Sequence, residues 1–308
     1  MHESITNGGA GATAFGDGNV YTASAAAGTT WEVAESARLR TMDGILDSVM
    51  QHDLDPVIGE LQARADGRPV TLLDIGSGAG TSVEDLATEN GVTYYAFDGS
   101  QPMLDQRSTP PERKILGRME DMSGIPDGAF DITYTRAATA WSKDPDSTIA
   151  DQLRITGERA VFTEYDWSEA SVASNDPKVL AAGMAARDLM MLVLEIAGFK
   201  TEFGKDLAER VARVAVASGQ VVALSQVRHE LPVDDHRDIF VASANTLLAL
   251  LGTEATGSGA GAAKAKATQG KLTKYLRIVE EAPAGTVSVR IPALSTVVVH
   301  KSSHMPAQ

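Results

Sequence analysis

The stretch VTLLDIGSGAGTSVEDLA, residues 70–87, constrains the fold more than any other part of the chain. It begins as a β-branched and aliphatic run, which is typical of a parallel strand covered on both faces. The run reaches Asp74, and glycines follow at positions 76, 78 and 80 before a helical pattern begins. A strand, a glycine turn and a helix in this order predict a ligand site at the carboxyl edge of an α/β sheet.

The spacing of these glycines narrows the class of ligand. A Walker-type phosphate loop carries a lysine after its last glycine, and none follows here. A dinucleotide site has the spacing G-x-G-x-x-G, whereas this turn reads G-x-G-x-G and has Thr81 where the third glycine would fall. Asp74 also makes the turn acidic, which suits a ligand with positive charge, such as an amine or a sulfonium, better than a pyrophosphate. The bare backbone still allows an adenosine to lie close against it.

A second acid stands at the corresponding place in the next predicted strand. Asp98 ends the run YYAFD, 24 residues after Asp74. A carboxylate at this place can accept hydrogen bonds from both ribose hydroxyls of a nucleoside that lies across the strand ends. Either acid alone could be an ordinary turn or cap residue, but the pair after adjacent strands favours a nucleoside site.

Short apolar strands alternate with helical segments over residues 70–165. The predicted strands read VTLLDIG, VTYYAFDG, RKILG, FDITYTR and RAVFTEYDW. Strands separated by helices at this spacing predict an α/β fold with a doubly wound, mostly parallel sheet and right-handed crossovers. The runs QVVALSQVRHELPV (220–233) and TVSVRIPALSTVVVHK would add further strands to the same sheet.

Two regions flank this series. Residues 1–65 are predicted to form a flexible Gly/Ala/Ser/Thr-rich segment followed by a helical lid in two pieces, WEVAESARLRTMDGILDSVM and DPVIGELQARA. Residues 66–308 are predicted to be one core in which about 167–270 form cap insertions. Within this insertion, the low-complexity run at 252–270 is predicted to be a flexible surface loop.

Composition limits the partners. The chain of 308 residues is 43% hydrophobic, has no cysteine and carries a formal net charge of −14. The lack of cysteine excludes disulfides, thiolate metal ligands and thiol nucleophiles, and the acidic balance disfavours nucleic acid and anionic membranes. No run is long and apolar enough for a membrane span, and the N-terminal residues have no secretory pattern. We therefore expect a cytoplasmic protein with a small-molecule partner.

These motifs together resemble the class I, Rossmann-like S-adenosylmethionine-dependent methyltransferases, in the small-molecule branch, which implies a seven-stranded sheet. LLDIGSGAG resembles the family's first motif, and YYAFDGSQPML resembles its second, where the family places the ribose acid. GRMEDMSGIPDGAFDITYTRAATAW resembles the segment around the adenine, although Arg118 stands where many members have an aspartate. The resemblance implies S-adenosylmethionine as cofactor, with contacts from Asp74, Gly76, Ser77, Gly78, Gly80, Asp98, Gly99, Ser100, Met103, Met119 and Glu120.

The family's N-terminal helix often covers the cofactor. The resemblance therefore adds Tyr21, Trp31 and Arg38 as cofactor-binding candidates. Arg38 could pair with the methionyl carboxylate, or it could be a solvated helix arginine. Arg136, at the end of a predicted strand, could bind the same carboxylate or an anion on the acceptor.

The implied reaction is in-line displacement at the sulfonium methyl by O, N or C of a small metabolite, in specialised metabolism. Such a reaction depends on alignment and desolvation more than on a catalytic motif, so no catalytic residue is assigned. Residues at the later strand ends are the candidates for the acceptor site: Arg136, Trp141, Glu164, Tyr165, Asp166, Trp167 and His229. The run EYDW could equally be a strand that leaves the sheet, and His229 a surface histidine.

No histidine stands in a metal pattern such as H-E-x-x-H, so no metal is predicted. A helix with Met184, Met190 and Met191 could wall an apolar acceptor, pack in the core or form the face of a homodimer. Two other functions stay open. The first is an S-adenosylmethionine-binding enzyme that catalyses a non-methyl reaction such as a cyclisation. The second, disfavoured by the glycine spacing and Asp74, is an NAD-dependent oxidoreductase.

Overall fold

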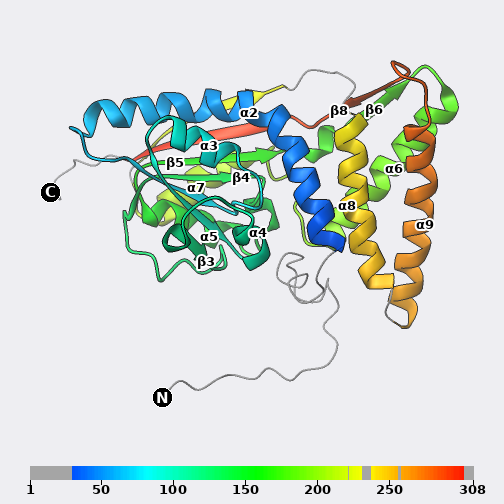
Figure 1. The fold of residues 1–308 in the computed structure, drawn as a ribbon, viewed down its shortest axis with the longest axis horizontal. Coiled ribbons are helices and arrows are strands. Elements are labelled where there is room, and N and C mark those ends of the chain that lie inside the picture. Colours follow the sequence, from blue (N-terminus) through cyan, green and yellow to red (C-terminus); the bar gives the residue numbers. More distant parts are fainter. Residues whose placement is uncertain (1–29, 221, 231–236, 256–257, 302–308) are drawn as a thin grey trace.

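The part of the chain that the computed structural model describes comprises residues 30–220, 222–230, 237–255 and 258–301 (Figure 1). The predicted flexible segment at the N-terminus, with Tyr21, lies outside the described residues. Among the described helices, none has the length and apolarity that a membrane span requires.

A seven-stranded sheet forms the centre of the fold, with the strand order β3-β2-β1-β4-β5-β9-β7. Neighbouring strands from β3 to β5 are parallel, and β9 is antiparallel to both β5 and β7. The prediction of a doubly wound, mostly parallel seven-stranded sheet is thereby confirmed. The strands are β1 (Thr71–Ile75), β2 (Thr93–Asp98), β3 (Lys114–Leu116), β4 (Phe130–Arg136), β5 (Thr156–Tyr165), β7 (Val222–His229) and β9 (Leu294–Lys301).

The strand order reverses beside β1. The chain runs from β1 outward through β2 to β3 and then returns to β4 on the other side of β1. Ile75 pairs with Phe97 of β2 and with Thr135 of β4, so the three strands end at almost the same level. Ligands of open α/β sheets bind outside the carboxyl ends of the strands at such a switch point.

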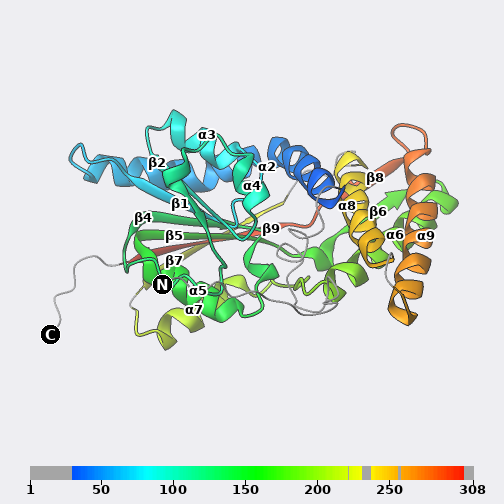
Figure 2. The ribbon, with the colours of Figure 1, turned by 60° about the horizontal axis from the view of Figure 1, so that its bottom comes forward.

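Helices cover both faces of the sheet. Figure 2 shows α2, α3 and α4 on one face and α5 and α7 on the other. On the first face, Leu54 and Ile58 of α2 are packed with Leu72, and on the second face Leu153 and Leu207 belong to a separate core. The bounds are α2 (Thr30–Arg64), α3 (Ser82–Glu89), α4 (Gln101–Asp105), α5 (Pro145–Ile155) and α7 (Leu207–Ala217).

The N-terminal helical lid is one helix and not the two pieces predicted. α2 continues through Pro56, although a proline inside a helix removes a hydrogen bond and costs about 3 kcal/mol. Leu54, Ile58 and Leu61 lie on either side of Pro56 and are almost fully buried, which offsets that cost. Figure 1 shows that α2 also changes direction along its length, so that its first part leaves the sheet and reaches α8 (Arg237–Ala255).

Beyond β5 the chain builds a cap beside the sheet. A two-stranded sheet of β6 (Ser171–Ser174) and β8 (Val287–Arg290) supports α6 (Pro177–Ile196), α8 and α9 (Ala260–Glu280). In Figures 1 and 2 these helices stand side by side at one end of the molecule, next to the first part of α2. The cap therefore borders the carboxyl ends of the strands, where the switch point lies.

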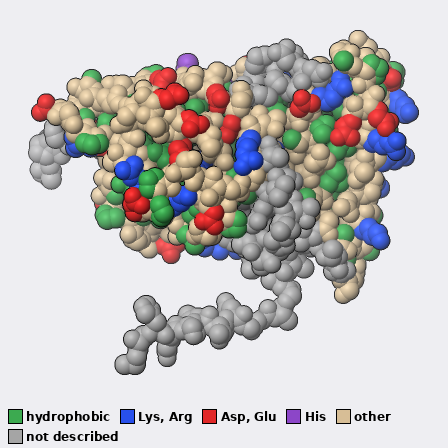
Figure 3. All heavy atoms as spheres, viewed as in Figure 1, with side chains coloured by type: hydrophobic (Ala, Val, Ile, Leu, Met, Phe, Trp, Pro, Cys, Tyr) green, Lys and Arg blue, Asp and Glu red, His purple; other side chains and the backbone are tan. Residues whose placement is uncertain are grey.

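The prediction of a flexible loop at 252–270 is wrong. α8 continues to Ala255, and α9 begins at Ala260. Alanine and lysine favour helix, and Ala265, Leu272 and Leu276 bury one face of α9 in the core of the cap. The opposite face carries exposed lysines, and Lys and Arg side chains gather at this edge of the molecule (Figure 3): Lys264, Lys266, Lys271 and Lys274.

Candidate functional site

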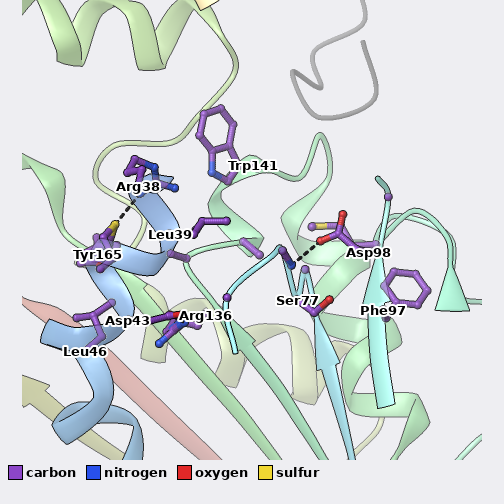
Figure 4. Close-up of a pocket in the computed structure, with 18 of the residues that line it drawn as sticks. Arg38, Leu39, Asp43, Leu46, Ser77, Phe97, Asp98, Arg136, Trp141 and Tyr165 are labelled. Carbon is purple, nitrogen blue, oxygen red and sulfur yellow. Dashed lines mark hydrogen bonds and ion pairs between the residues drawn. The ribbon is translucent and has the colours of Figure 1, made fainter. Parts of the chain in front are cut away.

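A cleft of about 1000 Å³ opens at the switch point (Figure 4). Its walls come from the glycine loop after β1, the residues after β2, β3 and β4, and the first part of α2. Five residues of α2 line it, and all but Arg38 were absent from the sequence candidates: Leu39, Met42, Asp43 and Leu46. The sequence candidates in its wall are Arg38, Gly76, Ser77, Gly78, Gly80, Asp98, Gly99, Met119, Arg136, Trp141 and Tyr165.

The glycine loop needs bare backbone for two reasons. Gly76 and Gly78 have φ angles of +70° and +58°, a region that side chains disfavour. The loop is also tightly packed, because a Cβ on Gly76 would lie 2.4 Å from Cβ of Ala138, and a Cβ on Gly80 would lie 2.5 Å from Oδ2 of Asp43. The glycines therefore let β4 and α2 approach the loop, in addition to any ligand.

Asp98 is held by the loop that it faces. Its Oδ2 accepts a hydrogen bond from the backbone N–H of Gly78, and its Oδ1 accepts one from the N–H of Ser100, both at 2.8 Å. Burial raises the pKa of the Asp98 carboxyl, against the lowering effect of these two hydrogen bonds. Each carboxylate oxygen can accept a further hydrogen bond, and the side chain lines the cleft.

Asp74 lies beneath the loop and is not part of the cleft wall. It accepts a hydrogen bond from the hydroxyl of Tyr94 at 2.8 Å, and its Oδ2 is 3.5 Å from Nη2 of Arg107. Arg107 in turn donates from Nε to the carbonyl of Gly78 at 3.0 Å and from Nη2 to the carbonyl of Ser77. Burial raises the pKa of the Asp74 carboxyl, and the charge of Arg107 opposes that rise. Asp74 thus acts on the loop through a buried arginine, which no sequence pattern indicated.

Asp43 joins three parts of the site. Its Oδ1 is 2.7 Å from Nη2 of Arg136, and its Oδ2 accepts a hydrogen bond from the backbone N–H of Thr81 at 3.1 Å (Figure 4). α2 is thereby tied to the end of β4 and to the glycine loop. The available signal was an acid between Leu39 and Leu46 on the apolar side of the helix. Nη1 of Arg136 is buried and has no hydrogen-bond partner.

Of the remaining cofactor candidates, some line the cleft and others are paired or buried outside its wall. Met119 lines the cleft beside Arg118, whereas Oε1 of Glu120 accepts a hydrogen bond from the N–H of Lys143 at 3.0 Å. Arg38 pairs with Glu35 through Nε at 2.7 Å and also contacts Met42. Ser100 and Met103 are fully buried outside the cleft wall, and Trp31 lies in α2, where its side chain is outside the description.

A second cavity, of about 610 Å³, adjoins the cleft on the side of the cap. Four residues line both cavities: Arg38, Ala137, Trp141 and Tyr165. The other lining residues are mainly apolar and come from the start of the cap, from α6 and the residues after it, and from α8: Trp167, Met190, Leu194, Phe199, Leu247 and Leu250. The polar ones are Glu35 of α2 and Ser243 and Thr246 of α8. Met190 is thus both a core residue and a wall of this cavity.

Three acceptor-site candidates lie away from both cavities. Glu164 accepts a hydrogen bond from the N–H of Thr139 at 2.7 Å, and burial raises the pKa of its carboxyl to about 8. Asp166 caps a short 3-10 helix by accepting from the N–H of Ser168 at 3.2 Å. Nε2 of His229 is 2.8 Å from Oδ1 of Asp53 on α2.

Comparison with known proteins agrees with this geometry. A family model described as a methyltransferase domain matches residues 73–162, which run from β1 into β5. Among curated protein sequences the chain has no significant match. The solved structure of the plantazolicin methyltransferase BamL, in complex with a triazolic desmethylPZN analog and SAH, is similar at 12% identity and a TM-score of 0.50, over 92% of this chain and 96% of that one.

Two other solved structures are similar at lower scores. One is described as a methyltransferase from an antibiotic biosynthesis pathway of Anabaena variabilis, with 17% identity, a TM-score of 0.47 and coverage of 78% of this chain and 96% of that one. The other is the [4+2]-cyclase SpnF, with 15% identity, a TM-score of 0.41 and coverage of 90% and 98%. By its domain and its sheet, the chain has a Rossmann-like α/β fold with a methyltransferase domain. The match over residues 73–162 agrees with the sequence resemblance to the class I S-adenosylmethionine-dependent methyltransferases.

Proposed function

We propose that the chain binds S-adenosylmethionine in the cleft at the switch point and transfers its methyl group to a small molecule in the adjoining cavity. The observation that carries the proposal is that the two cavities share Arg38, Ala137, Trp141 and Tyr165 as walls. Two ligands that meet at a common wall can be aligned for direct transfer, and alignment is the main contribution that a protein makes to such a reaction.

The residues of the cleft fit this cofactor. Asp98 would accept hydrogen bonds from the ribose hydroxyls, and Phe97 and Met119 would contact the adenine. Nη1 of Arg136, which is buried without a hydrogen-bond partner, would donate to the methionyl carboxylate. Gly78 has no side chain, so its backbone is accessible to the ligand. A Cβ at this position would also lie 3.0 Å from Cδ1 of Leu39. When bound, the cofactor would supply an activated methyl group on a sulfonium.

The second cavity favours an apolar acceptor of moderate size. Its lining is mainly apolar with a few polar side chains, which is typical of sites for small organic ligands. Aromatic and aliphatic walls, such as Trp141, Phe199 and Leu250, would exclude water around the acceptor, and the few polar side chains would orient it. We therefore propose a small, mainly apolar metabolite, as in specialised metabolism, as the acceptor.

Tyr165 is the polar group best placed to act on an acceptor. Its ring lines both cavities, and its hydroxyl is buried without a hydrogen-bond partner. Burial raises the pKa of this hydroxyl, so Tyr165 stays protonated at neutral pH and can donate a hydrogen bond but cannot serve as a base. The proposed role is therefore orientation of an acceptor oxygen or nitrogen.

Calorimetric titration of the tag-free protein with S-adenosylhomocysteine, and separately with NADH, tests the choice of cofactor. We expect one S-adenosylhomocysteine per chain and no heat from NADH. Tight binding of NADH without binding of S-adenosylhomocysteine would overturn the proposal in favour of an oxidoreductase. Once an acceptor is found, product without S-adenosylhomocysteine would indicate a non-methyl reaction such as a cyclisation.

A further inference from the structure

Two histidines and an aspartate that are distant in the sequence meet where α2 crosses the edge of the sheet. His52 and Asp53 are consecutive residues of α2, and His229 is the last residue of β7. Oδ1 of Asp53 is 3.2 Å from Nδ1 of His52 and 2.8 Å from Nε2 of His229. One ligand atom from each residue can be chosen so that all three lie within 4.8 Å of one another.

The Asp53 carboxylate at the centre of this cluster is buried and is oriented by a hydrogen bond to its other oxygen. The side chain of Asp53 is only 2% exposed, and its Oδ2 accepts a hydrogen bond from Oγ1 of Thr296 on β9 at 2.5 Å. Oγ1 of Thr296 lies 3.1 Å from Oγ1 of Thr163, which is also buried. Hydrogen bonds of this kind orient the carboxylate ligands of metal ions. Oδ1 is thereby turned toward the two imidazole rings.

The rings reach the carboxylate from different directions. Their centroids are 5.1 Å apart and their planes make an angle of 81°, so they do not stack face to face. The His52 side chain is 63% exposed, whereas that of His229 is 13% exposed. Solvent therefore reaches the cluster from the side of His52, while Asp53 and His229 are largely buried.

We propose that His52, Asp53 and His229 form a binding site for a divalent transition-metal ion such as Zn²⁺. Two imidazoles and one carboxylate are a common ligand set for zinc, which leaves a fourth position for water. Ligand atoms 2.0–2.1 Å from a tetrahedral ion lie about 3.4 Å apart. The distance from Oδ1 to Nδ1 of His52 would therefore grow from 3.2 Å by about 0.2 Å, and that to Nε2 of His229 from 2.8 Å by about 0.6 Å. The net charge of −14 also favours a cation.

The site is separate from the cleft, and its ion would have a structural effect. Asp43, which lines the cleft, is ten residues before Asp53 on α2, or about 15 Å along the helix axis. A bound ion would join α2 to β7, the last strand in the sheet order. The helix that walls the cleft would then be fixed to the sheet edge by three ligands from two elements. The proposal does not depend on the identity of the cofactor.

The test compares single-histidine variants of the full chain, made without an affinity tag and treated with a chelator. Zn²⁺ is titrated into wild type, His52→Ala, His229→Ala and the matched control His300→Ala, which removes a partly buried histidine of β9 outside the cluster. We expect one ion per chain in wild type and in the control, and an affinity at least about tenfold lower in each cluster variant. Since His52 is largely exposed, its variant is expected to fold normally.

The melting temperature and the absorption of bound Co²⁺ are measured on the same variants. Zn²⁺ should raise the melting temperature of wild type and of His300→Ala, and should raise that of His52→Ala less at the same Zn²⁺ concentration, because an ion that binds only the folded state stabilises it in proportion to its occupancy. Co²⁺ bound in the same place should show the visible absorption of a tetrahedral ion. No binding by wild type, or an affinity in His52→Ala and in His229→Ala equal to that of wild type, would overturn the proposal and leave an ordinary hydrogen bond between His229 and Asp53.

Discussion

The cleft and the adjoining cavity meet at four side chains, yet they are built in opposite ways. The cleft combines the glycine loop and charged groups at the ends of β2 and β4 with side chains of α2, and its lining residues run from Arg38 to Tyr165. The cavity is formed by apolar side chains that extend from Glu35 to Leu250. The first can recognise a polar ligand of constant structure, and the second can change its shape with a few side chains.

This difference gives each region a distinct response to mutation. Changes in the cleft should alter affinity for the cofactor and leave the acceptor's own contacts intact. Changes in the cavity should alter affinity for the acceptor and leave the cofactor's dissociation constant unchanged. A variant that changes both by similar factors would show that the two regions are not independent.

The largest effect is expected from Gly76→Ala. A side chain at φ +70° and 2.4 Å from Cβ of Ala138 must displace the loop, which combines backbone strain with overpacking. Together these cost about 2–4 kcal/mol, seen as lower stability and as weaker binding of S-adenosylhomocysteine. Denaturant unfolding and calorimetry measure the two parts.

Gly91→Ala is the matched control for this substitution. Gly91 has a similar φ of +66°, but no atom lies within 4 Å of its missing Cβ. It therefore shares the backbone strain without the collision, and we expect a smaller loss of stability and an unchanged dissociation constant. Equal effects in both variants would mean that the packing of Gly76 against Ala138 is unimportant.

Asp98→Ala should weaken S-adenosylhomocysteine by roughly 1.5–3 kcal/mol, the scale of hydrogen bonds to a charged group. The substitution also removes the acceptor of the Gly78 and Ser100 N–H groups, so the fold should be checked by circular dichroism. Asp105→Ala, which removes an exposed acid of α4, is the control and should bind like wild type. A dissociation constant for Asp98→Ala equal to that of wild type would exclude Asp98 as the ribose acid.

Leu247→Trp should act on the cavity alone. Leu247 lines the cavity and not the cleft, so a larger side chain there fills space intended for the acceptor. With an acceptor identified by S-adenosylhomocysteine formation, we expect KM to rise about tenfold, or 1.4 kcal/mol, while the cofactor's dissociation constant changes less than about twofold. Leu192→Trp, on the exposed side of α6, controls for the added ring. An unchanged KM would place the acceptor elsewhere.

The smallest effect concerns Glu164, which supports the wall between the two regions through Thr139. Burial raises the pKa of Glu164 in the folded protein to about 8, from the ordinary value of 4.5. The folded chain thus binds more protons than the unfolded chain between these values, so the free energy of unfolding falls as pH rises through this window. We expect a loss of about 1 kcal/mol between about pH 6 and pH 7.

Glu164→Gln separates this contribution from the other titrating groups. Glutamine keeps an oxygen for the Thr139 N–H and remains neutral, so the variant should lose stability less steeply across the same window. Urea unfolding of both proteins at several pH values gives the comparison. Parallel curves for the two proteins would show that Glu164 titrates near its ordinary pKa.

The sequence predicted the sheet well because its signals are local. Each strand from β1 to β5 is a short apolar run bounded by turn residues, and the glycine loop and Asp98 are marked by position alone. α9 was mistaken for a loop because its early residues lack a strong apolar stripe, and its helix depends on burial of Ala265 and Leu272 against the rest of the cap. Pro56 similarly suggested a helix start, whereas packing on the sheet carries α2 through it.

The candidate site also depends on contacts between elements that are distant in the sequence. Asp74 could be found from the motif, but its attachment to Arg107 depends on a residue 33 positions later that no pattern marks. Asp43 and Leu39 enter the site because α2 folds over the loop, and Leu247 enters the cavity from the cap. His229, which the sequence left open as an acceptor-site candidate or a surface histidine, is paired with Asp53. Contacts between distant elements are what the sequence alone could not supply.

The most direct test of the central account is the fate of the cofactor's methyl group. The protein is incubated with methyl-labelled S-adenosylmethionine and an apolar acceptor, and both the labelled product and S-adenosylhomocysteine are counted. The account predicts one labelled methyl group in the product for each S-adenosylhomocysteine released, with both lost together in Leu247→Trp at low acceptor concentration. Product that forms without label and without S-adenosylhomocysteine would contradict it.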